Sequence, residues 1–350
     1  RNRHPGASDL VNRKRDDMSR ELTPAAAAFC QQVGIRYPVI GGPMYPCSNP
    51  ELTAAVSAAG GIGILQPISL TYVHGHEYRK GIRLMQKLTD KPIGMNALIE
   101  KSSKKYHQRM SEWIDIALEE GIRFFVTSLG KPDWVVERVH AVGGLVYHDV
   151  TEMKWAKIGL DNGVDGLICV NNRAGGHAGP QSMQQIYEEL HGLGVPLVCA
   201  GGIGDSRDFW DALDTGYSAC QLGTRFIAST ECRASDAYKQ AVVSAVESDI
   251  VLSERVTGIP VSVINTDFIK RSGTGLGWFS RWMLSGNKTK HWMRMFYGLK
   301  SIWQLKHSSL DEKGEKDYWQ AGKSVAAIDS IETCENTVSY THLRAHETLG

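Results

Sequence analysis

The sequence of 350 residues has no run of 18 apolar residues, so we expect no transmembrane helix. Its net charge is only +1, which gives no reason to expect a nucleic-acid partner. The seven cysteines are an odd number, and no pair has the C-x-x-C spacing of a zinc or redox motif. We therefore expect a cytoplasmic protein with no structural disulfides and no metal site.

Both ends of the chain lack the patterns of folded or targeting segments. Residues 1–17 are basic but contain no apolar stretch of the kind that a signal peptide needs. We expect the natural protein to start at Met18. Residues 339–350 are polar and without periodicity, so we expect both end segments to be non-native or disordered.

Short apolar runs recur along the first 226 residues, with helical segments between them. The eight runs are rich in Val, Ile and Leu and do not alternate strictly; they cover residues 38–44, 61–65, 92–98, 124–129, 145–150, 166–171, 196–202 and 219–226. Parallel strands that are covered on both faces have this composition. Eight strand–helix alternations predict an α/β protein of the (β/α)8 TIM-barrel class. A doubly wound open sheet is the alternative, but its glycine-rich first turn has no clear counterpart here.

The domain organisation follows from where this rhythm stops. We predict an N-terminal extension over residues 1–29, a barrel over 30–228, and a mainly helical insertion or cap over 229–318. A C-terminal helix over 319–338 then returns to the barrel. Ser48 and Glu51 have the spacing of a capping box at the start of the first barrel helix.

Glycines follow the last two predicted strands, where barrel enzymes commonly bind phosphate. The seventh run leads into "AGGIGDSRD", with Gly201 and Gly202, and the eighth ends in "LGTRF", with Gly223 and Thr224. Backbone N–H groups of such loops converge on an anion. Glycines end strands in many proteins, so one such loop would mean little. Two in consecutive loops favour a phosphate site.

Other strand ends carry residues with two interpretations each. The segment "GPM" (42–44) either lines a flat ring or forms a simple turn. Asn96 either bonds the edge of a heteroaromatic ring or caps a turn. His148 and Asp149 are either site residues or a satisfied pair at the barrel rim.

The stretch "NRAGGHAGP" (172–180) follows the sixth run and contains His177. A loop histidine is inert in most proteins. Here the loop lies on the face where barrel enzymes place their sites, and a histidine exchanges protons near neutral pH. We therefore favour a catalytic histidine over an inert one.

Taken together, these stretches resemble the nitronate monooxygenase (2-nitropropane dioxygenase-like) family of FMN-dependent TIM-barrel enzymes. The resemblance covers roughly residues 30–235 and 319–328, through "IGGPM", "NPELTAAVSAAGGIGIL", "TDKPIGMNAL", "RAGGHAGP", "VPLVCAGGIGD", "LGTRFIASTEC" and "WQAGKSVAAI". Flavin-dependent enoyl-ACP reductases and NADH:quinone reductases share close versions of these motifs.

The resemblance implies a role for each matching residue. It makes His177 the catalytic residue, as a base or as a donor that polarises the substrate. It assigns FMN to Gly42, Pro43, Met44, Asn96, Gly175, Gly176, Gly201, Gly202, Gly223 and Thr224. It also brings Gln320, Gly322 and Lys323 toward the flavin from the C-terminal helix. From their positions at the predicted mouth, Arg173, His148 and Lys323 are our candidate substrate residues. The family usually has an acidic or similar residue in place of Arg173, and its quinone-reductase branch has a lysine in place of Asp149.

The resemblance implies oxidation of alkyl nitronates by dioxygen to a carbonyl compound and nitrite. The alternative is a reductase of enoyl thioesters or quinones that uses FMN and NAD(P)H. A homodimer is left open. The expected partners are a small-molecule substrate and dioxygen.

A separate feature lies in residues 270–306, which contain eight Lys or Arg and no Asp or Glu, with four tryptophans between them. Such a segment can dock on an anionic membrane or on an acidic partner, such as an acyl carrier protein or a CoA ester. In the alternative interpretation, it packs its tryptophans on the barrel and leaves its charges in water. The first interpretation keeps a partner-docking flavoprotein as a further alternative.

Overall fold

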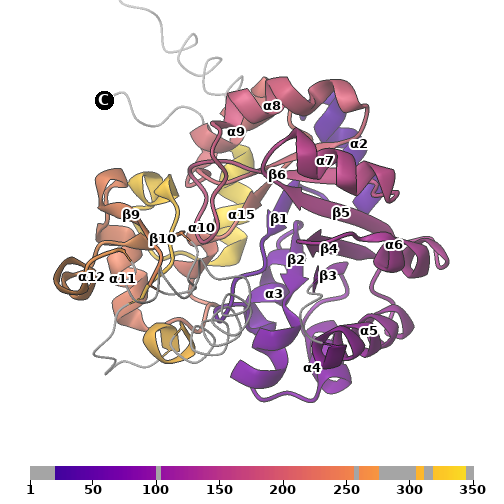
Figure 1. Ribbon diagram of the computed structural model, residues 1–350, viewed down its shortest axis with the longest axis horizontal. Helices are drawn as coiled ribbons and strands as arrows, with labels where there is room; N and C mark the ends of the chain where they lie inside the picture. The colour runs from indigo at the N-terminus through magenta and orange to yellow at the C-terminus, as the bar shows by residue number, and fades with distance from the viewer. Residues whose placement is uncertain (1–19, 100–103, 256–259, 276–304, 311–317, 344–350) are drawn as a thin grey trace, which may run out of the picture.

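The computed structural model describes residues 20–99, 104–255, 260–275, 305–310 and 318–343 (Figure 1). Its centre is a closed barrel of eight parallel strands in chain order. The strands are β1 (Val39–Gly41), β2 (Ile62–Leu65), β3 (Ile93–Leu98), β4 (Phe124–Ser128), β5 (Leu145–Val150), β6 (Gly166–Val170), β7 (Leu197–Ala200) and β8 (Ala219–Leu222). Each lies within one of the eight predicted runs, so the predicted TIM barrel is confirmed.

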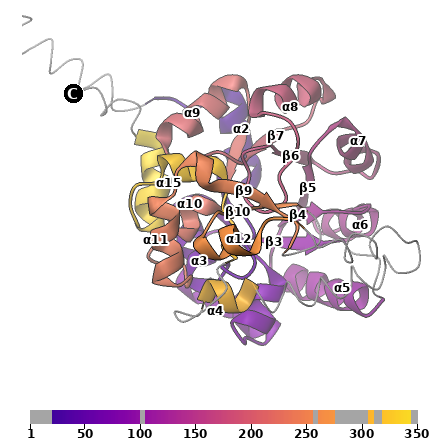
Figure 2. The same cartoon turned by 60° about the vertical axis from the view of Figure 1, so that its left-hand side comes forward.

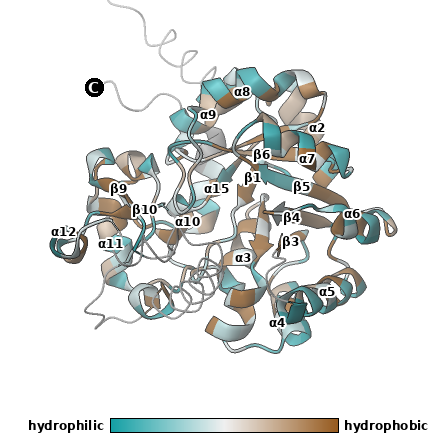
Figure 3. Ribbon diagram, viewed as in Figure 1, coloured by the Kyte–Doolittle hydropathy of each residue, from teal (hydrophilic) through white to brown (hydrophobic). Residues whose placement is uncertain are grey.

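Helices follow the strands and form the outer layer of the barrel. They are α3 (Pro50–Ala58), α4 (Tyr78–Leu88), α5 (Lys104–Glu119), α6 (Asp133–His140), α7 (Met153–Asp161), α8 (Met183–Leu190), α9 (Ser206–Thr215) and the short α10 (Thr224–Ile227). A π-helical turn, η1 (Ser69–Val73), precedes α4, and a 3-10 turn, η2 (His191–Leu193), follows α8. The strands are mainly hydrophobic, with a hydrophilic stretch on β5, whereas the helices also carry many hydrophilic residues (Figure 3). In the described parts of the chain, no helix is long and apolar enough to cross a membrane.

The helix α2 (Pro24–Val33) closes the amino end of the barrel. Phe29 is buried against the rings of Phe124 and Tyr147, at centroid distances of 6.4 and 5.7 Å. The Tyr147 hydroxyl also donates to Oε1 of Gln32, at 2.9 Å. The predicted boundary between extension and barrel at residue 29 therefore falls inside a helix that belongs to the barrel core.

The predicted capping box at Ser48 is wrong. Asn49 is the N-cap of α3, without a side-chain capping bond. The Ser48 hydroxyl instead accepts from the backbone N–H of Met44, at 2.8 Å, and so shapes the loop after β1. A capping box does occur at α8, between Ser182 and Gln185.

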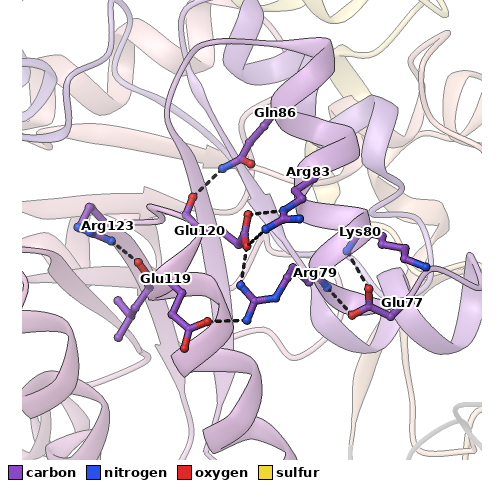
Figure 4. Close-up of polar contacts among 9 residues, drawn as sticks. Glu77, Arg79, Lys80, Arg83, Gln86, Glu119, Glu120 and Arg123 are labelled. Carbon is purple, nitrogen blue, oxygen red and sulfur yellow. Dashed lines mark hydrogen bonds and ion pairs between the residues drawn. The ribbon is translucent and has the colours of Figure 1, made fainter.

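Ion pairs join α4 to the end of α5 on the outside of the barrel (Figure 4). Arg83 contacts both carboxylate oxygens of Glu120, at 2.9 Å each, and Arg79 contacts Glu119 and Glu120. Because water reaches both arginines, it screens these pairs, and they add little to stability.

The segment after β8 is less helical than predicted. It contains α11 (Asp236–Ser244), the 3-10 turn η3 (Glu247–Asp249), α12 (Asp267–Ser272) and helical residues 305–310. It also contains an antiparallel pair, β9 (Ile250–Ser253) and β10 (Val261–Ile264), which sequence analysis missed. When the molecule is turned so that the insertion comes forward, β9, β10 and α12 lie in front of the barrel (Figure 2). The basic segment 270–306 lies outside the described residues, except for 270–275 and 305–306.

The chain returns to the barrel in a different form from the predicted helix over 319–338. Residues 318–322 are extended, and Gln320 forms a β-bridge with Val263 of β10. The 3-10 helix η4 (Lys323–Ala327) follows, and then α15 (Cys334–Leu343). Since α15 continues to Leu343, the predicted disordered tail does not begin at residue 339.

Replacing Phe29 by alanine should lower the free energy of unfolding by about 3–5 kcal/mol, because it opens a cavity between α2 and the barrel interior. Urea unfolding followed by circular dichroism measures this change. Leu88→Ala is the matched control, since Leu88 is 50% exposed, and it should cost no more than about 0.5 kcal/mol. Equal losses in the two variants would contradict the assignment of Phe29 to the core.

Candidate active site

The barrel closes between β1 and β8, and this closure brings the first and eighth loops together. The N–H of Gly42 donates to the carbonyl of Leu222, at 2.9 Å. A Cβ atom at Gly223 would lie 3.5 Å from the sulfur of Met44. The predicted ring-binding residues 42–44 and the predicted phosphate loop at Gly223 and Thr224 are therefore neighbours at the carboxyl end of the barrel.

Strand register shows which polar side chains face into this end of the barrel. Side chains alternate along a strand, and inward residues of alternate strands share one level in a TIM barrel. At the carboxyl ends of β1, β3, β5 and β7, one inward residue of each strand lies at the same level. These four residues are Gly42, Asn96, Asp149 and Ala200. Just beneath it lies Gln221, level with the apolar side chains of Ile64, Val126 and Ile168. We call these four residues, together with Gln221 beneath them, the polar floor. Gly42 and Ala200 carry almost no side chain, so the floor stays open on the side that faces the mouth.

Two oxygens of the floor have no hydrogen-bond partner among the residues that the structure describes. Oδ1 of Asp149 and Oε1 of Gln221 are sealed from solvent, and no described residue donates a hydrogen bond to either atom. Burial raises the pKa of Asp149 to about 7. Buried acceptors without donors are costly, so these atoms fit a site that a polar ligand completes. The sequence did point to Asp149 but could not separate it from its neighbour His148.

The sixth and seventh loops are locked together by Asn171, which sequence analysis did not single out. Its side-chain Nδ2 donates to the carbonyl of Gly201, at 2.8 Å, and its Oδ1 accepts from the N–H of Arg173, at 2.9 Å. Gly201 has a φ of 111°, and a Cβ atom there would lie 2.5 Å from Oδ1 of Asn171. An asparagine at the end of the sixth run was the available signal.

The loop that carries His177 is held from outside by the insertion and the returning chain. The carbonyl of Gly176 accepts from the N–H of Ser262 in β10, at 2.8 Å. The Thr224 hydroxyl accepts from the N–H of Gly322, at 2.9 Å. A Cβ atom at Gly175 would lie only 2.9 Å from the nitrogen of Gly322. Gly175 therefore permits two backbones to touch, which is a different reason for a glycine from the one that the sequence suggested.

His177 projects from this clamped loop at the mouth of the barrel. Its side chain is reached by solvent, and no described residue hydrogen-bonds its imidazole. Surrounding protein atoms nevertheless desolvate the ring and lower its pKa below the usual histidine value. At pH 7 the imidazole is neutral and has one nitrogen that can accept a proton.

The three predicted substrate residues are each engaged by other groups of the protein. Nη1 of Arg173 pairs with Glu247, at 2.9 Å, and Nζ of Lys323 contacts the same carboxylate, at 3.5 Å. His148 faces outward, hydrogen-bonded to Thr127 at 2.8 Å and in contact with Gly159 of α7. Its position one residue before an inward-facing Asp149 requires this orientation, and burial lowers its pKa to about 4. Gln320 and Gly322 lie against the sixth loop.

The rim after β4 holds a strained backbone. Leu129 has a φ of 61°, the positive range that a bulky residue rarely adopts, and its side chain is 58% exposed. Strain of this kind concentrates at functional sites.

A cleft of about 590 Å³ also exists, but it lies at the amino end of the barrel beside α2, away from the residues described above. Within the described residues, no group of His, Cys, Asp and Glu could hold a metal ion.

Gly175→Ala should lower the free energy of unfolding by about 1–3 kcal/mol, because the added methyl group forces the sixth loop away from residues 321–322. Gly192→Ala is the control, since no atom lies within 4 Å of its added Cβ, and it should change stability by no more than about 0.5 kcal/mol. Thermal and urea unfolding both test the difference. A tolerated Gly175→Ala would mean that the two backbones can separate without cost.

Arg173→Gln should leave substrate preference unchanged, because the guanidinium is engaged with Glu247. The two side chains are 35% and 43% exposed, so a double-mutant cycle with Glu247→Gln should give a coupling of at most about 1 kcal/mol. The ratio of kcat/KM for two substrates is the decisive measurement. A several-fold change in that ratio would return Arg173 to the substrate site.

Comparison with known proteins agrees with this arrangement. A dehydrogenase from Rhodococcus jostii, named for (3aS,4S,5R,7aS)-5-hydroxy-7a-methyl-1-oxo-octahydro-1H-indene-4-carboxyl-CoA, is 26% identical and aligns over 91% of this chain and 95% of its own. Nitronate monooxygenase of Pseudomonas aeruginosa is 28% identical over 61% of this chain and 72% of its own. The structure of FabK from Thermotoga maritima superposes with a TM-score of 0.73 and 25% identity, over 90% of this chain and 94% of that one.

The family profile described as nitronate monooxygenase matches residues 27–340, which include the barrel, the insertion and most of α15. The match thus spans the polar floor, the loop of His177 and the strands that clamp it. The chain belongs to the nitronate monooxygenase family of flavin-dependent oxidoreductases.

Proposed function

We propose that this enzyme binds FMN at the carboxyl end of the barrel and oxidises alkyl nitronates with dioxygen to a carbonyl compound and nitrite. The observation that carries the proposal is the polar floor beneath a solvent-open histidine. The floor offers unpartnered acceptors at Asp149 and Gln221, together with the amide of Asn96. A flat heteroaromatic ring with polar edges fits such a floor better than an apolar ligand does.

The glycine loops after β7 and β8 would hold the phosphate of the cofactor. Gly201 and Gly202 have φ angles of 111° and 83°, and this backbone leaves them at the mouth without side chains. The loop containing Gly223 and Thr224 lies beside the loop of residues 42–44, which would line the ring. FMN would supply the acceptor for two electrons.

His177 would act on the substrate. It lies on the clamped loop, beyond the strand ends that form the floor, and its imidazole is neutral at pH 7. Its free nitrogen can take a proton from the carbon next to a nitro group, or its N–H can donate to an oxygen of a bound nitronate. The clamp from β10 and residues 320–322 fixes the position of this ring relative to the floor.

A second candidate is an oxidoreductase of CoA or acyl-carrier thioesters, with NAD(P)H as the second substrate if it runs as a reductase. The specific observation in its favour is the coverage of the Rhodococcus CoA dehydrogenase, which aligns over 95% of its length, including the insertion. The insertion forms one wall of the mouth through β10, so likeness in that segment bears on substrate choice.

Anaerobic reduction separates these two functions. We expect an alkyl nitronate, and neither NAD(P)H nor a saturated acyl-CoA, to bleach the visible absorption of the bound flavin. Readmitting air should then restore the colour and release nitrite. Bleaching by NAD(P)H or by the thioester would establish the second candidate instead. A purified protein that cannot be loaded with FMN would refute both.

His177→Gln should keep the bound flavin but lower kcat/KM by about 10²–10⁴-fold, because it removes the proton acceptor. His140→Gln is the control, since His140 pairs with Asp165 on the surface and should be replaceable within about twofold. In the wild type, a base with a lowered pKa stays neutral on acidification, so kcat/KM should fall only below the ordinary histidine range near 6.5. An unchanged rate in His177→Gln would remove His177 from the reaction.

A further inference from the structure

Asp149 is an ionisable side chain placed in the interior of the barrel. It follows the buried Tyr147 by two positions on β5 and so shares the inward face. The other inward residues at its level are Gly42, Asn96 and Ala200, none of which can neutralise a carboxylate. Its Oδ1 is sealed from water and receives no hydrogen bond from any described residue.

The groups that face Asp149 from the neighbouring elements carry no charge. The register places Gln221 and three apolar side chains on the level below, and Gln66, Ser128, Val170 and Gly223 on the level above. His148 is adjacent in sequence but faces α7. The charged or titratable groups of the described rim include His177 on its loop, Asp208 beside Gly204, and Arg173 and Lys323, which both contact Glu247.

Asp149 is only partly buried as a residue, but its sealed Oδ1 has lost its hydration and no cation lies beside it. The physical result is a preference for the neutral acid, and burial raises the pKa of Asp149 to about 7. A neutral carboxylic acid differs from a carboxylate in one respect that matters for recognition, because it has an O–H to donate. Near neutral pH, Asp149 can therefore present either a donor or a negative charge to a ligand on the floor.

We propose that Asp149 is a proton-holding residue of the cofactor site, and that its single proton links the colour and reduction of the bound flavin to pH. This inference rests on the proposed binding of FMN above the floor. A protonated Asp149 donates to an acceptor atom on the edge of the ring. An ionised Asp149 places a charge beside the ring, which disfavours the negative charge that reduction adds. Asp149 is thus a group that sets how readily the cofactor takes electrons, whichever substrate provides them.

The test uses the holoenzyme and three proteins: wild type, Asp149→Asn and His177→Gln. Asparagine keeps the shape of the side chain but cannot ionise, and His177→Gln removes the other titratable group that is open at the mouth. The visible spectrum of the bound flavin is titrated between about pH 5.5 and 8.5, a range centred on the raised pKa. We expect a one-proton spectral transition in the wild type and in His177→Gln, and none in Asp149→Asn.

The reduction potential gives a second readout, measured by equilibration with a reference dye at several pH values. The potential of the wild type should fall more steeply with pH across the transition than that of Asp149→Asn. Bound FMN without a transition, or a transition that persists in Asp149→Asn, overturns this proposal alone. If the wild-type protein fails to bind FMN, the proposed function is overturned as well. The failure of this proposal can therefore be distinguished from the failure of the proposed function.

The apoprotein provides a measurement that needs no flavin. The unfolded state has an ordinary aspartate, with a pKa near 3.9, whereas the folded state holds the proton up to a higher pH. As pH rises from 5 to 8, the unfolding free energy of the wild type should therefore fall relative to that of Asp149→Asn. A constant difference between the two proteins would show that Asp149 ionises normally and would overturn the proposal.

Discussion

The hydrogen-bonded pairing of β1 with β8 is the constraint on which the rest of this structure depends. Ile40 pairs with Gln221, residues that are about 180 positions apart in the chain. Once these strands meet, the eight carboxyl ends form one ring, and loops from opposite ends of the sequence become neighbours. The shear of a closed barrel then fixes which inward side chains share a level. Asn96 and Asp149, on β3 and β5, belong to one polar floor for this reason and not because of any local motif.

The mouth has a second constraint, because backbone contacts clamp its most important loop. Three segments meet there: the loop of Gly175 and Gly176, β10 of the insertion, and the extended residues 320–322. A side chain at Gly175 or Gly322 would collide with the backbone of its partner segment. The insertion is thus part of the active-site architecture, because it determines where His177 is held. A fixed position of this kind is what the role proposed for His177 requires.

The barrel could be predicted from the sequence because its signal is repeated and local. Eight apolar runs at regular intervals favour a single closed topology, and each glycine-bearing strand end falls on the same face once that topology is accepted. The orientation of His148 and Asp149 could not be predicted in the same way. Adjacent residues on a strand face opposite sides, and only the register of the neighbouring strands shows which of the two faces inward.

Two other features could not be predicted for a common reason: the residues involved are held by groups far away in the sequence. Arg173 looked available because its counter-ion, Glu247, is 74 residues further along the chain. The strands β9 and β10 have four residues each, too short for a clear alternating pattern, and they are stabilised by contacts with each other and with Gly176. Propensity cannot supply information of that kind, since tertiary pairing decides the outcome.

The division of the site between strands and loops explains how one family can include proteins named for different substrates. The floor is built on strand ends that the barrel holds rigidly, and the walls come from the sixth loop and the insertion. Changing a wall alters what can approach, whereas changing the floor alters the environment of whatever binds there. Asp149 belongs to the floor, so its charge affects electron transfer for any substrate that the walls admit. A residue that tunes electron transfer is therefore separated in space from the residues that select the substrate, and the two properties can change independently.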